Sequence, residues 1–366
     1  MTLGRYICLR FLRMMFLTAL VIAGLVGLLA SVENFRLAAS QDASVGIALV
    51  LTLHQLPQIL GQTFPLVMML ASLATFLSLS RSSEMVIVRA SGVSGLRVLI
   101  WPLAAAALIG VLATAAFNPI IAASSVRAGE IRDEITGNPR SILSVDKRNV
   151  WLRQGLETGQ TVIQAQRVSE RGAVLYGVLL HEFDTDNELV ARVQADSAIL
   201  SRDAWLLRGV LRWSLKGPMG TPIGRPEALP QLNVPTNLTR EQILDSFAQP
   251  QAISIWALPA FISQLEQAGF AATRHRIFFQ AELARPLLFV AMTMIGAAFS
   301  LRHVRFGNVG VMILFAVLAG FSLFFFKDIA ETLGGNGDVP ILLAAWSPPV
   351  AAILLITGLL LHLEDG

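Results

Sequence analysis

Long apolar stretches dominate this sequence of 366 residues, and they decide which class of fold it can adopt. One of them, Gly46–Ser80, runs for 35 residues without a formal charge. A transmembrane helix needs about 20 consecutive apolar residues, so this stretch is longer than one perpendicular span. Hydrophobic residues make up 54% of the chain and charged residues only 14%, whereas an average soluble domain has about 25% charged residues. The sequence therefore predicts an α-helical integral membrane protein.

Six stretches are long and apolar enough to cross a bilayer. They are Met14–Val32, Leu56–Leu79, Val98–Asn118, Ile277–Leu301, Phe306–Phe326 and a segment within Val339–Leu363. We expect Pro348 and Pro349 to break the last one near its start, because proline removes a helical hydrogen bond. The first stretch follows basic residues but lacks a convincing small-residue cleavage site, so we interpret it as a retained span rather than a signal peptide.

Residues 127–249, between the third and fourth spans, have a different character. Charges are frequent, and large apolar residues alternate with polar ones, as in the expected half-buried strand Trp205–Leu215. Further strands are expected at Val162–Val168, Val174–Phe183 and Leu189–Ala195, and Gly217–Pro235 is expected to be a loop or an edge. About 120 residues of short strands fit one antiparallel sandwich or jelly roll.

Three domains follow along the chain. Residues 1–126 carry the first three spans, residues 127–249 form the inserted all-β domain, and residues 250–366 carry an amphipathic connector and the last three spans. The connector, Ile253–Gly269, has apolar residues at helical spacing, so it packs on the β domain or lies in the plane of the membrane. The expected fold is six transmembrane helices (3+3) with an inserted jelly-roll-like domain.

Basic residues are shared unevenly between the two ends of the spans. Arg36 and Lys327 are the two basic residues in the short loops of one side, and eight arginines lie on the other. The eight are Arg5, Arg10, Arg13, Arg81, Arg89, Arg97, Arg302 and Arg305. Because basic residues accumulate on the cytoplasmic side, both termini are expected in the cytoplasm and the β domain outside it.

The segment Arg81–Gly92 follows the second span and carries the signals of a short helix. Ser82 or Ser83 can cap its N-terminus, and Glu84 in the first turn suits the helix dipole. Gly92 can end it. The residues of its apolar side are Met85, Val88 and Ala90 or Gly92. Such a side fits the groove of a soluble partner, and a solvated loop is the alternative interpretation.

Ionisable residues near the outer ends of the spans form a second candidate site. Glu282 and Arg285 lie three residues apart on one face of the fourth span, where they can pair with each other. The candidate residues are Arg36, Arg274, Arg276, Glu282, Arg285 and Lys327. A basic collar at the membrane surface suits phosphorylated lipid headgroups, and ordinary interfacial anchoring is the alternative.

Sequence signals of catalysis and of nucleic-acid binding are missing. The sequence contains no P-loop, no H-E-x-x-H and no G-x-S-x-G. Its single cysteine, Cys8, and five scattered histidines make a metal site improbable, and no cofactor is expected. The net charge of +3 with no basic tract argues against a nucleic-acid partner. The spans also lack a chain of acidic and histidine residues for proton-driven transport, so energy is expected from elsewhere.

The arrangement resembles a known family over essentially the whole chain. Three spans, a β domain and three more spans, with Ser83–Gly92 after the second span, are similar to the lipopolysaccharide export permeases LptF and LptG, the YjgP/YjgQ family. Arg5-Tyr6 and Phe64-Pro65-Leu66 add to the resemblance. The Ala-Ser-Gly ending of the first segment, the region Ile253–Pro286 and Asp328 look more like LptG than LptF.

The resemblance implies a place and a set of partners. Members of this family act in the inner membrane of Gram-negative bacteria as a pair of sister permeases, LptF and LptG, above an LptB-type ATPase dimer and beside LptC. They extract lipopolysaccharide from the outer leaflet and pass it to a periplasmic bridge of the LptA type, and their periplasmic domain is a jelly roll. The family's coupling helix corresponds here to residues that would contact the ATPase: Ser83, Glu84, Met85, Val88, Arg89 and Gly92.

One departure from the family concerns the first span. LptG-type sequences place a lysine near its outer end, whereas Leu29–Glu33 contains none. Arg36, about one turn later, is the expected substitute.

Two other classes of function remain open at this stage. The first is an ABC-linked protein that transmits force to periplasmic partners and moves nothing through its spans, although such proteins often have four spans. The second is a membrane-bound enzyme that acts on envelope lipids, which would need a nucleophile or metal site. A neighbouring gene for a sister protein of similar length and topology would favour the paired permease.

Overall fold

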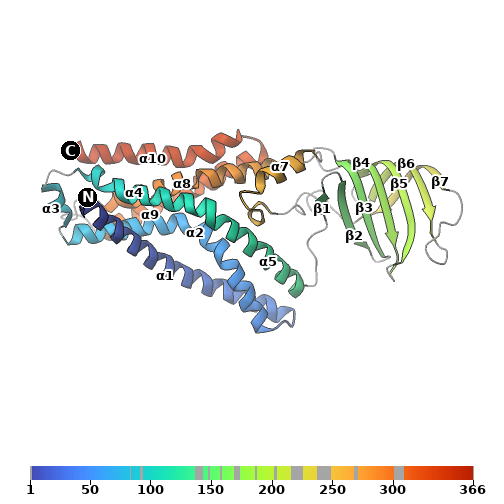
Figure 1. Ribbon diagram of the computed structural model, residues 1–366, viewed down its shortest axis with the longest axis horizontal. Coiled ribbons are helices and arrows are strands. Elements are labelled where there is room, and N and C mark those ends of the chain that lie inside the picture. Colours follow the sequence, from blue (N-terminus) through green and yellow to red (C-terminus); the bar gives the residue numbers. More distant parts are fainter. Residues whose placement is uncertain are drawn as a thin grey trace. The chain divides into compact units, whose positions relative to one another are not determined.

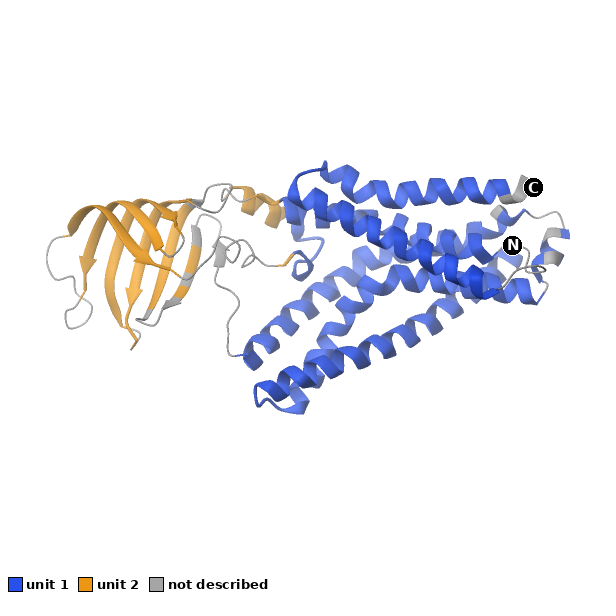
Figure 2. Ribbon diagram, turned by 180° about the vertical axis from the view of Figure 1, so that it is seen from behind, with its two compact units in different colours: residues 1–136, 250–258, 273–366 blue, residues 137–249, 259–272 orange. Residues whose placement is uncertain are grey.

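The computed structural model has two compact units, which Figure 2 shows in different colours. The first unit contains residues 1–136, 250–258 and 273–366, and the second contains residues 137–249 and 259–272. The structure describes residues 2–82, 84–90, 94–136, 143–146, 149–156, 159–168, 174–185, 188–201, 204–215, 226–236, 249–267, 271–300 and 309–365. Ser83, Gly92 and the expected basic turn Arg302–Arg305 therefore lie outside the described residues.

The first unit is a bundle of long helices (Figure 1). Its long helices are α1 (Thr2–Ser40), α2 (Val45–Arg81), α4 (Gly95–Leu112) continued by η1 (Ala113–Phe117) and α5 (Asn118–Thr136), α8 (Thr273–Ser300), α9 (Val309–Asn336) and α10 (Ile341–Asp365). Within the described ranges, six helical segments are long and apolar enough to cross a membrane. The prediction of six spans, arranged as three before and three after the inserted domain, is confirmed.

Several helices extend further than the apolar pattern predicted. The polar segments after the first and fifth apolar stretches are helical, so α1 has 39 residues and α9 has 28. At about 1.5 Å per residue, α1 is longer than the ~30 Å hydrocarbon core. Its polar end is held by packing: Asn34 Nδ2 donates to Thr52 Oγ1 of α2 at 3.0 Å, and Ala38 is buried. Tertiary contacts thus continue the helix beyond the apolar run.

The expected break at Pro348 and Pro349 is not present, because both prolines lie inside the continuous helix α10. Both side chains are buried, and neighbouring helices help membrane helices to tolerate prolines in their interior.

Helices α2 and α8 form the centre of the bundle, and they have the largest buried shares among the six spans. Gly296 of α8 approaches α2 so closely that an added Cβ would lie 2.3 Å from the carbonyl oxygen of Met69. Ser72 Oγ of α2 donates to the carbonyl oxygen of Thr293 at 2.7 Å. Small residues and interhelical hydrogen bonds of this kind hold membrane helices together, where apolar lipid weakens the hydrophobic drive between helices.

The second unit contains a seven-stranded antiparallel sheet. Its strands are β1 (Leu143–Asp146), β2 (Asn149–Leu156), β3 (Gly159–Val168), β4 (Val174–Phe183), β5 (Leu189–Leu200), β6 (Ala204–Ser214) and β7 (Glu227–Pro235). The four strands predicted between 162 and 215 are all present, and β7 is the expected edge. The order of the described strands is sequential, as in an up-and-down meander, and so differs from the crossed connections of a jelly roll.

A glycine in β6 interrupts the predicted alternation of apolar residues. Trp205 and Leu207 are buried, as expected, but the next buried side chain is Val210 rather than residue 209. Gly209 has a φ of +64°, and an added Cβ would lie 2.1 Å from Asp196 Oδ2. The pairs of β5 with β6 keep one register on both sides of this point, so the buried face of β6 changes at Gly209 without an inserted residue.

Two boundaries differ from those expected. The helix α5 runs to Thr136, so the predicted start of the β domain at residue 127 lies inside a helix. The connector begins as a short 3₁₀ turn, η3 (Pro250–Ala252), and its helix α7 covers only Leu258–Gln267. Pro259 is in the first turn of α7, where a missing backbone donor costs nothing, which explains the later start.

Candidate functional site

The segment after the second span is helical, as predicted. Helix α3 (Glu84–Ala90) lies at the same end of the bundle as both chain termini (Figure 1). Ser82 caps the C-terminus of α2, because its backbone N–H donates to the carbonyl oxygen of Ser78. The alternative of a solvated loop is thereby excluded for the seven described residues of α3.

Glu84 is tied to the N-terminal part of α1. Arg10 Nη1 donates to both carboxylate oxygens of Glu84, at 2.9 and 3.1 Å, and the Tyr6 hydroxyl donates to Oε2 at 2.9 Å. Ser82 Oγ donates to Oε1 at 2.7 Å. The hydrogen bond from Arg10, followed by that from Ser82, lowers the pKa of the Glu84 carboxyl below its usual value. Glu84 is therefore an anion at neutral pH.

The apolar side of α3 faces its own bundle rather than solvent. Met85 is only 6% exposed and belongs to a buried cluster with Ile7 and Leu79, and Val88 packs against the same cluster. By contrast, Ile87 is 69% exposed. The sequence expectation that Met85 and Val88 are offered to a partner groove is therefore not met in this structure. The side chain of Arg89 lies outside the described part of the chain.

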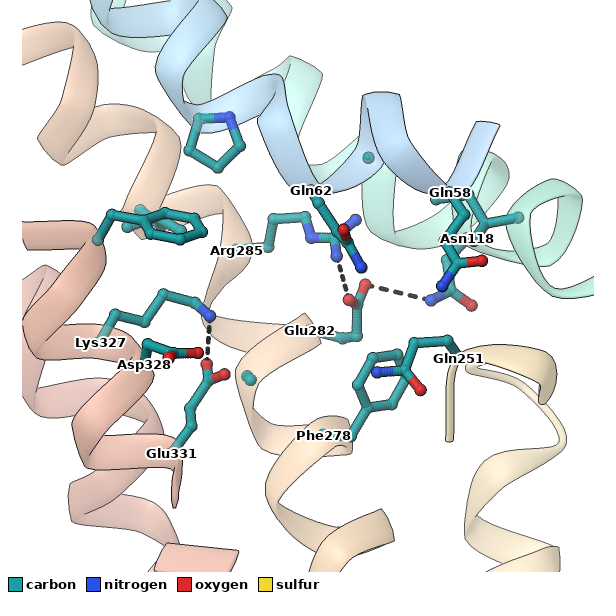
Figure 3. Close-up of a pocket in the computed structure, with 16 residues that line it drawn as sticks. Gln58, Gln62, Asn118, Gln251, Phe278, Glu282, Arg285, Lys327, Asp328 and Glu331 are labelled. Carbon is teal, nitrogen blue, oxygen red and sulfur yellow. Dashed lines mark hydrogen bonds and ion pairs between the residues drawn. The ribbon is translucent and has the colours of Figure 1, made fainter. Parts of the chain in front are cut away.

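A polar pocket lies among the spans of the first unit, with a volume of about 350 Å³ (Figure 3). Four long helices (α2, α5, α8 and α9) and the turn η3 line it. Its polar and charged residues are Gln58, Gln62, Asn118, Gln251, Glu282, Arg285, Lys327, Asp328 and Glu331. A pocket with this many polar groups inside apolar helices is costly to form, so it points to a functional site.

Glu282 occupies the centre of the pocket in Figure 3. Its carboxylate pairs with Arg285 one turn along α8 and accepts a hydrogen bond from Asn118 Nδ2 at 3.2 Å. On α9, Lys327 Nζ lies 2.7 Å from Glu331 Oε1. The side chain of Glu282 is only 3% exposed, and Arg285 Nη1 is buried without a hydrogen-bond partner. The pocket therefore offers a guanidinium nitrogen that an anionic group could fill.

The six predicted headgroup residues separate into two sets. Glu282, Arg285 and Lys327 meet in the pocket, although they come from two different helices. Arg36 is exposed on α1, and Arg274 and Arg276 are exposed in the first turn of α8, but none of these three lines the pocket. The six residues therefore do not form the single basic collar that the sequence predicted. Three of them line the pocket, and the other three are exposed outside it.

Sequence reasoning missed the neutral half of the pocket. Gln58 and Gln62 stand four residues apart in an uncharged run, so they share one helical face, and this spacing was a usable signal. Asn118 could not be found in this way, because its partners are distant in the sequence. Its Oδ1 accepts from the backbone N–H of Ile255 at 2.8 Å, while its Nδ2 donates to Glu282.

The π-helical turn η1 adds a second contact to the same connector. A π-helical turn leaves carbonyl groups without their usual helical partners. Trp256 Nε1 donates to one of them, the carbonyl oxygen of Ala115, at 3.0 Å. Thr114 Oγ1 in this turn donates to the carbonyl oxygen of Glu282 at 2.9 Å. The third span, the pocket and the segment 250–258 are therefore joined by specific hydrogen bonds.

These features define a class of protein. Four of the six candidate spans line a charged pocket, a short helix lies at one end of the bundle, and a β sheet is inserted midway along the chain. Among the described residues, no group of three or more His, Cys, Asp or Glu could hold a metal ion. The arrangement is that of a multi-span membrane protein with a polar pocket among its helices.

Comparison with known proteins identifies the family. The family model "Lipopolysaccharide export system permease LptF/LptG" matches residues 5–362, so the chain belongs to this family. It is 24% identical to the Haemophilus influenzae protein named Lipopolysaccharide export system permease protein LptG, over 100% of this chain and 99% of that protein. It is 22% identical to the LptG protein of Escherichia coli K12, over 98% of each chain. The predicted family is confirmed, and both relatives carry the LptG name.

Proposed function

We propose that this chain is the non-catalytic permease subunit of an ATP-driven exporter, which extracts lipopolysaccharide from the outer leaflet of the inner membrane. The observation that carries the proposal is the end-to-end family match, which spans both α3 and the charged pocket. The lipid would then pass to a periplasmic bridge of the LptA type. The inserted β unit, on the outer side, would continue that path.

The energetics of extraction require an external energy source. Each CH₂ group that leaves the bilayer costs about 0.8 kcal/mol, and a lipopolysaccharide carries several acyl chains. The sequence holds no P-loop, so we propose that a separate ATPase delivers the energy mechanically. An LptB-type ATPase dimer that docks against α3 would deliver it, with a sister permease of the LptF type and LptC completing the complex.

Co-purification with an affinity tag on this chain tests which proteins it binds. After mild solubilisation of membranes that express the whole system, we expect the chain to carry with it an ATPase and a second permease of similar length. Recovery of the chain alone, in a folded and stable form, would contradict the proposal and would return attention to a force-transmitting scaffold or an envelope-lipid enzyme.

The pocket is proposed to receive a phosphate group of the lipid headgroup. Arg285 has a buried Nη1 without a protein partner, and Lys327 brings a second positive charge from α9. When a lipid phosphate replaces Glu331 as the partner of Lys327, the lysine remains paired with an anion. The side-chain amides of Gln58 and Gln62 offer uncharged hydrogen-bond donors to the same phosphate. The exposed Arg36, Arg274 and Arg276 would attract the anionic headgroup from the membrane surface.

Charge reversal at Lys327 is expected to impair lipid loading. A hydrogen bond to a charged group contributes about 1.5–3 kcal/mol, so Lys327→Glu should lower lipopolysaccharide binding by roughly tenfold or more. Photocrosslinking from a probe at Gln62 in the complex measures the loading. Arg36→Glu, outside the pocket, is the comparison and should have the smaller effect. Normal crosslinking in both variants would show that these residues only anchor the helices.

A further inference from the structure

The carboxylate of Glu84 is extensively hydrogen-bonded within this chain. An ionised carboxylate offers about four lone-pair sites. Oε1 accepts from Arg10 Nη1 and Ser82 Oγ, and Oε2 accepts from Arg10 Nη1 and the Tyr6 hydroxyl. A partner protein that binds Glu84 therefore competes with these contacts inside the chain.

Arg10 joins three helices through one guanidinium group. Its Nη1 binds Glu84 of α3, and its Nη2 donates to Ser78 Oγ of α2 at 2.8 Å. The same Nη1 donates to the hydroxyl of Tyr6, one turn earlier on α1, at 2.6 Å. The rigid, planar fork of arginine suits such multiple contacts better than a lysine would. Beneath this polar layer, Ile7 of α1 and Met85 of α3 share one buried cluster.

The position of α1 in the bundle makes this tie significant. Helix α1 packs against α2 and, less extensively, against α4. The most apolar part of α1 contains no buried residue, so α1 is the most peripheral of the six spans. Its two polar attachments lie near its ends, at Arg10 and at Asn34, which donates to Thr52 and Gln55 of α2. A peripheral helix held at its ends can shift when one attachment is moved.

We propose that Tyr6 and Arg10 are positioning residues that tie α1 to α3, so that a displacement of α3 moves the first span. This inference rests on the proposed function, in which α3 receives the movement of the ATPase. Glu84 then serves as a link inside the chain, and the partner meets the exposed side of α3 at Ile87. The peripheral first span becomes the element that responds to ATP hydrolysis.

The tie itself can be tested with the chain alone in lipid nanodiscs. Arg10→Met keeps the apolar stem of the side chain but removes the guanidinium, and hydrogen exchange is measured for the amides of residues 3–10 and 84–90. Loss of a charged hydrogen bond should accelerate exchange in both segments by roughly tenfold. Arg13→Met is the matched control, because Arg13 is an exposed arginine on the same helix. Unchanged exchange in Arg10→Met would overturn the tie.

The transmission step is tested in the assembled complex. We expect Arg10→Met to retain more of the bound ATPase than Glu84→Ala does, because Tyr6 and Ser82 still hold Glu84. Lipopolysaccharide released per ATP hydrolysed should fall by about fivefold or more, since α3 then moves without α1. Arg10→Lys retains a cation beside Glu84 and should restore much of this ratio, whereas Arg13→Met should leave it unchanged.

Each remaining outcome has a distinct meaning. An unchanged ratio in Arg10→Met, with faster amide exchange, would overturn the transmission role. Loss of the ATPase from the Arg10→Met complex would overturn it too, because Arg10 would then serve docking. A third outcome is that the wild-type complex releases no lipid with ATP, while amide hydrogen exchange is still faster in Arg10→Met than in Arg13→Met. In that case the proposed function and the transmission role are both wrong. The tie between α1 and α3 would still be supported.

Discussion

Arg285→Met is expected to destabilise the helical unit by about 3–5 kcal/mol, the usual cost of removing one partner of a buried ion pair. The variant leaves the carboxyl of Glu282 almost fully buried, without its cationic partner and dependent on the hydrogen bond from Asn118. The expected result is a marked fall in the midpoint of thermal unfolding, measured by size-exclusion chromatography of heated, detergent-solubilised protein.

Two controls separate this effect from simple loss of an arginine. The double variant Glu282→Gln/Arg285→Met removes both charges and should recover most of the stability, since no unpaired charge remains. Arg127→Met breaks the pair Arg127–Glu130, which has the same spacing of three residues but lies on the exposed face of α5. It should change the unfolding midpoint little. Equal destabilisation by Arg285→Met and Arg127→Met would contradict the burial argument.

Glu84→Ala is expected to lower both recovery of the ATPase and coupled transport by about tenfold, which corresponds to ~1.4 kcal/mol. The substitution removes all four hydrogen bonds that hold the first turn of α3 against α1 and α2. A docking helix that is no longer held in place must become ordered when the partner binds. The conformational entropy lost in this ordering lowers the affinity of the complex. Quantitative co-purification and ATP-dependent lipid release measure the two effects.

The matched control for Glu84→Ala is Glu33→Ala. Glu33 is an exposed carboxylate near the other end of α1. Its removal should leave both ATPase recovery and lipid release unchanged. If Glu84→Ala behaves in the same way as Glu33→Ala, α3 does not couple this chain to an ATPase.

The membrane-spanning architecture could be predicted from sequence because its signal is local. Apolar runs such as Val98–Asn118 are long enough to require a bilayer whatever surrounds them. The helix at Glu84 was likewise predicted from residues within one turn of it. Such features depend on neighbours in the chain and need no knowledge of tertiary contacts.

The direction of side chains could not be predicted in the same way. Met85 was expected to face a partner, but it faces the bundle, because the cluster that buries it includes Ile7, almost 80 residues away in the sequence. The pocket depends on contacts of the same kind, since Asn118 and Glu282 are 164 positions apart. Periodicity places residues on a face of a helix, but it does not say which face meets another helix.

Helix ends and strand order were the other differences. Polar residues after an apolar run predict a loop, yet α1 continues through Asn34 because α2 supplies hydrogen-bond partners for its side chain. In β6, strict alternation fails at Gly209, which has a positive φ, and the next buried side chain is that of Val210. Alternation identifies strands but contains no information on which strands are neighbours, so the meander order had to come from the structure.

The most direct test of the central claim is ATP-driven transfer of lipopolysaccharide by the purified complex. The complex would be reconstituted in proteoliposomes that contain lipopolysaccharide, with a soluble LptA-type acceptor that carries a photocrosslinker. The account predicts that crosslinked lipid accumulates on the acceptor only when ATP is hydrolysed, and that Glu84→Ala and Lys327→Glu both reduce it. Hydrolysis of ATP by the intact complex with no lipid on the acceptor would contradict the account and would favour a force-transmitting protein instead.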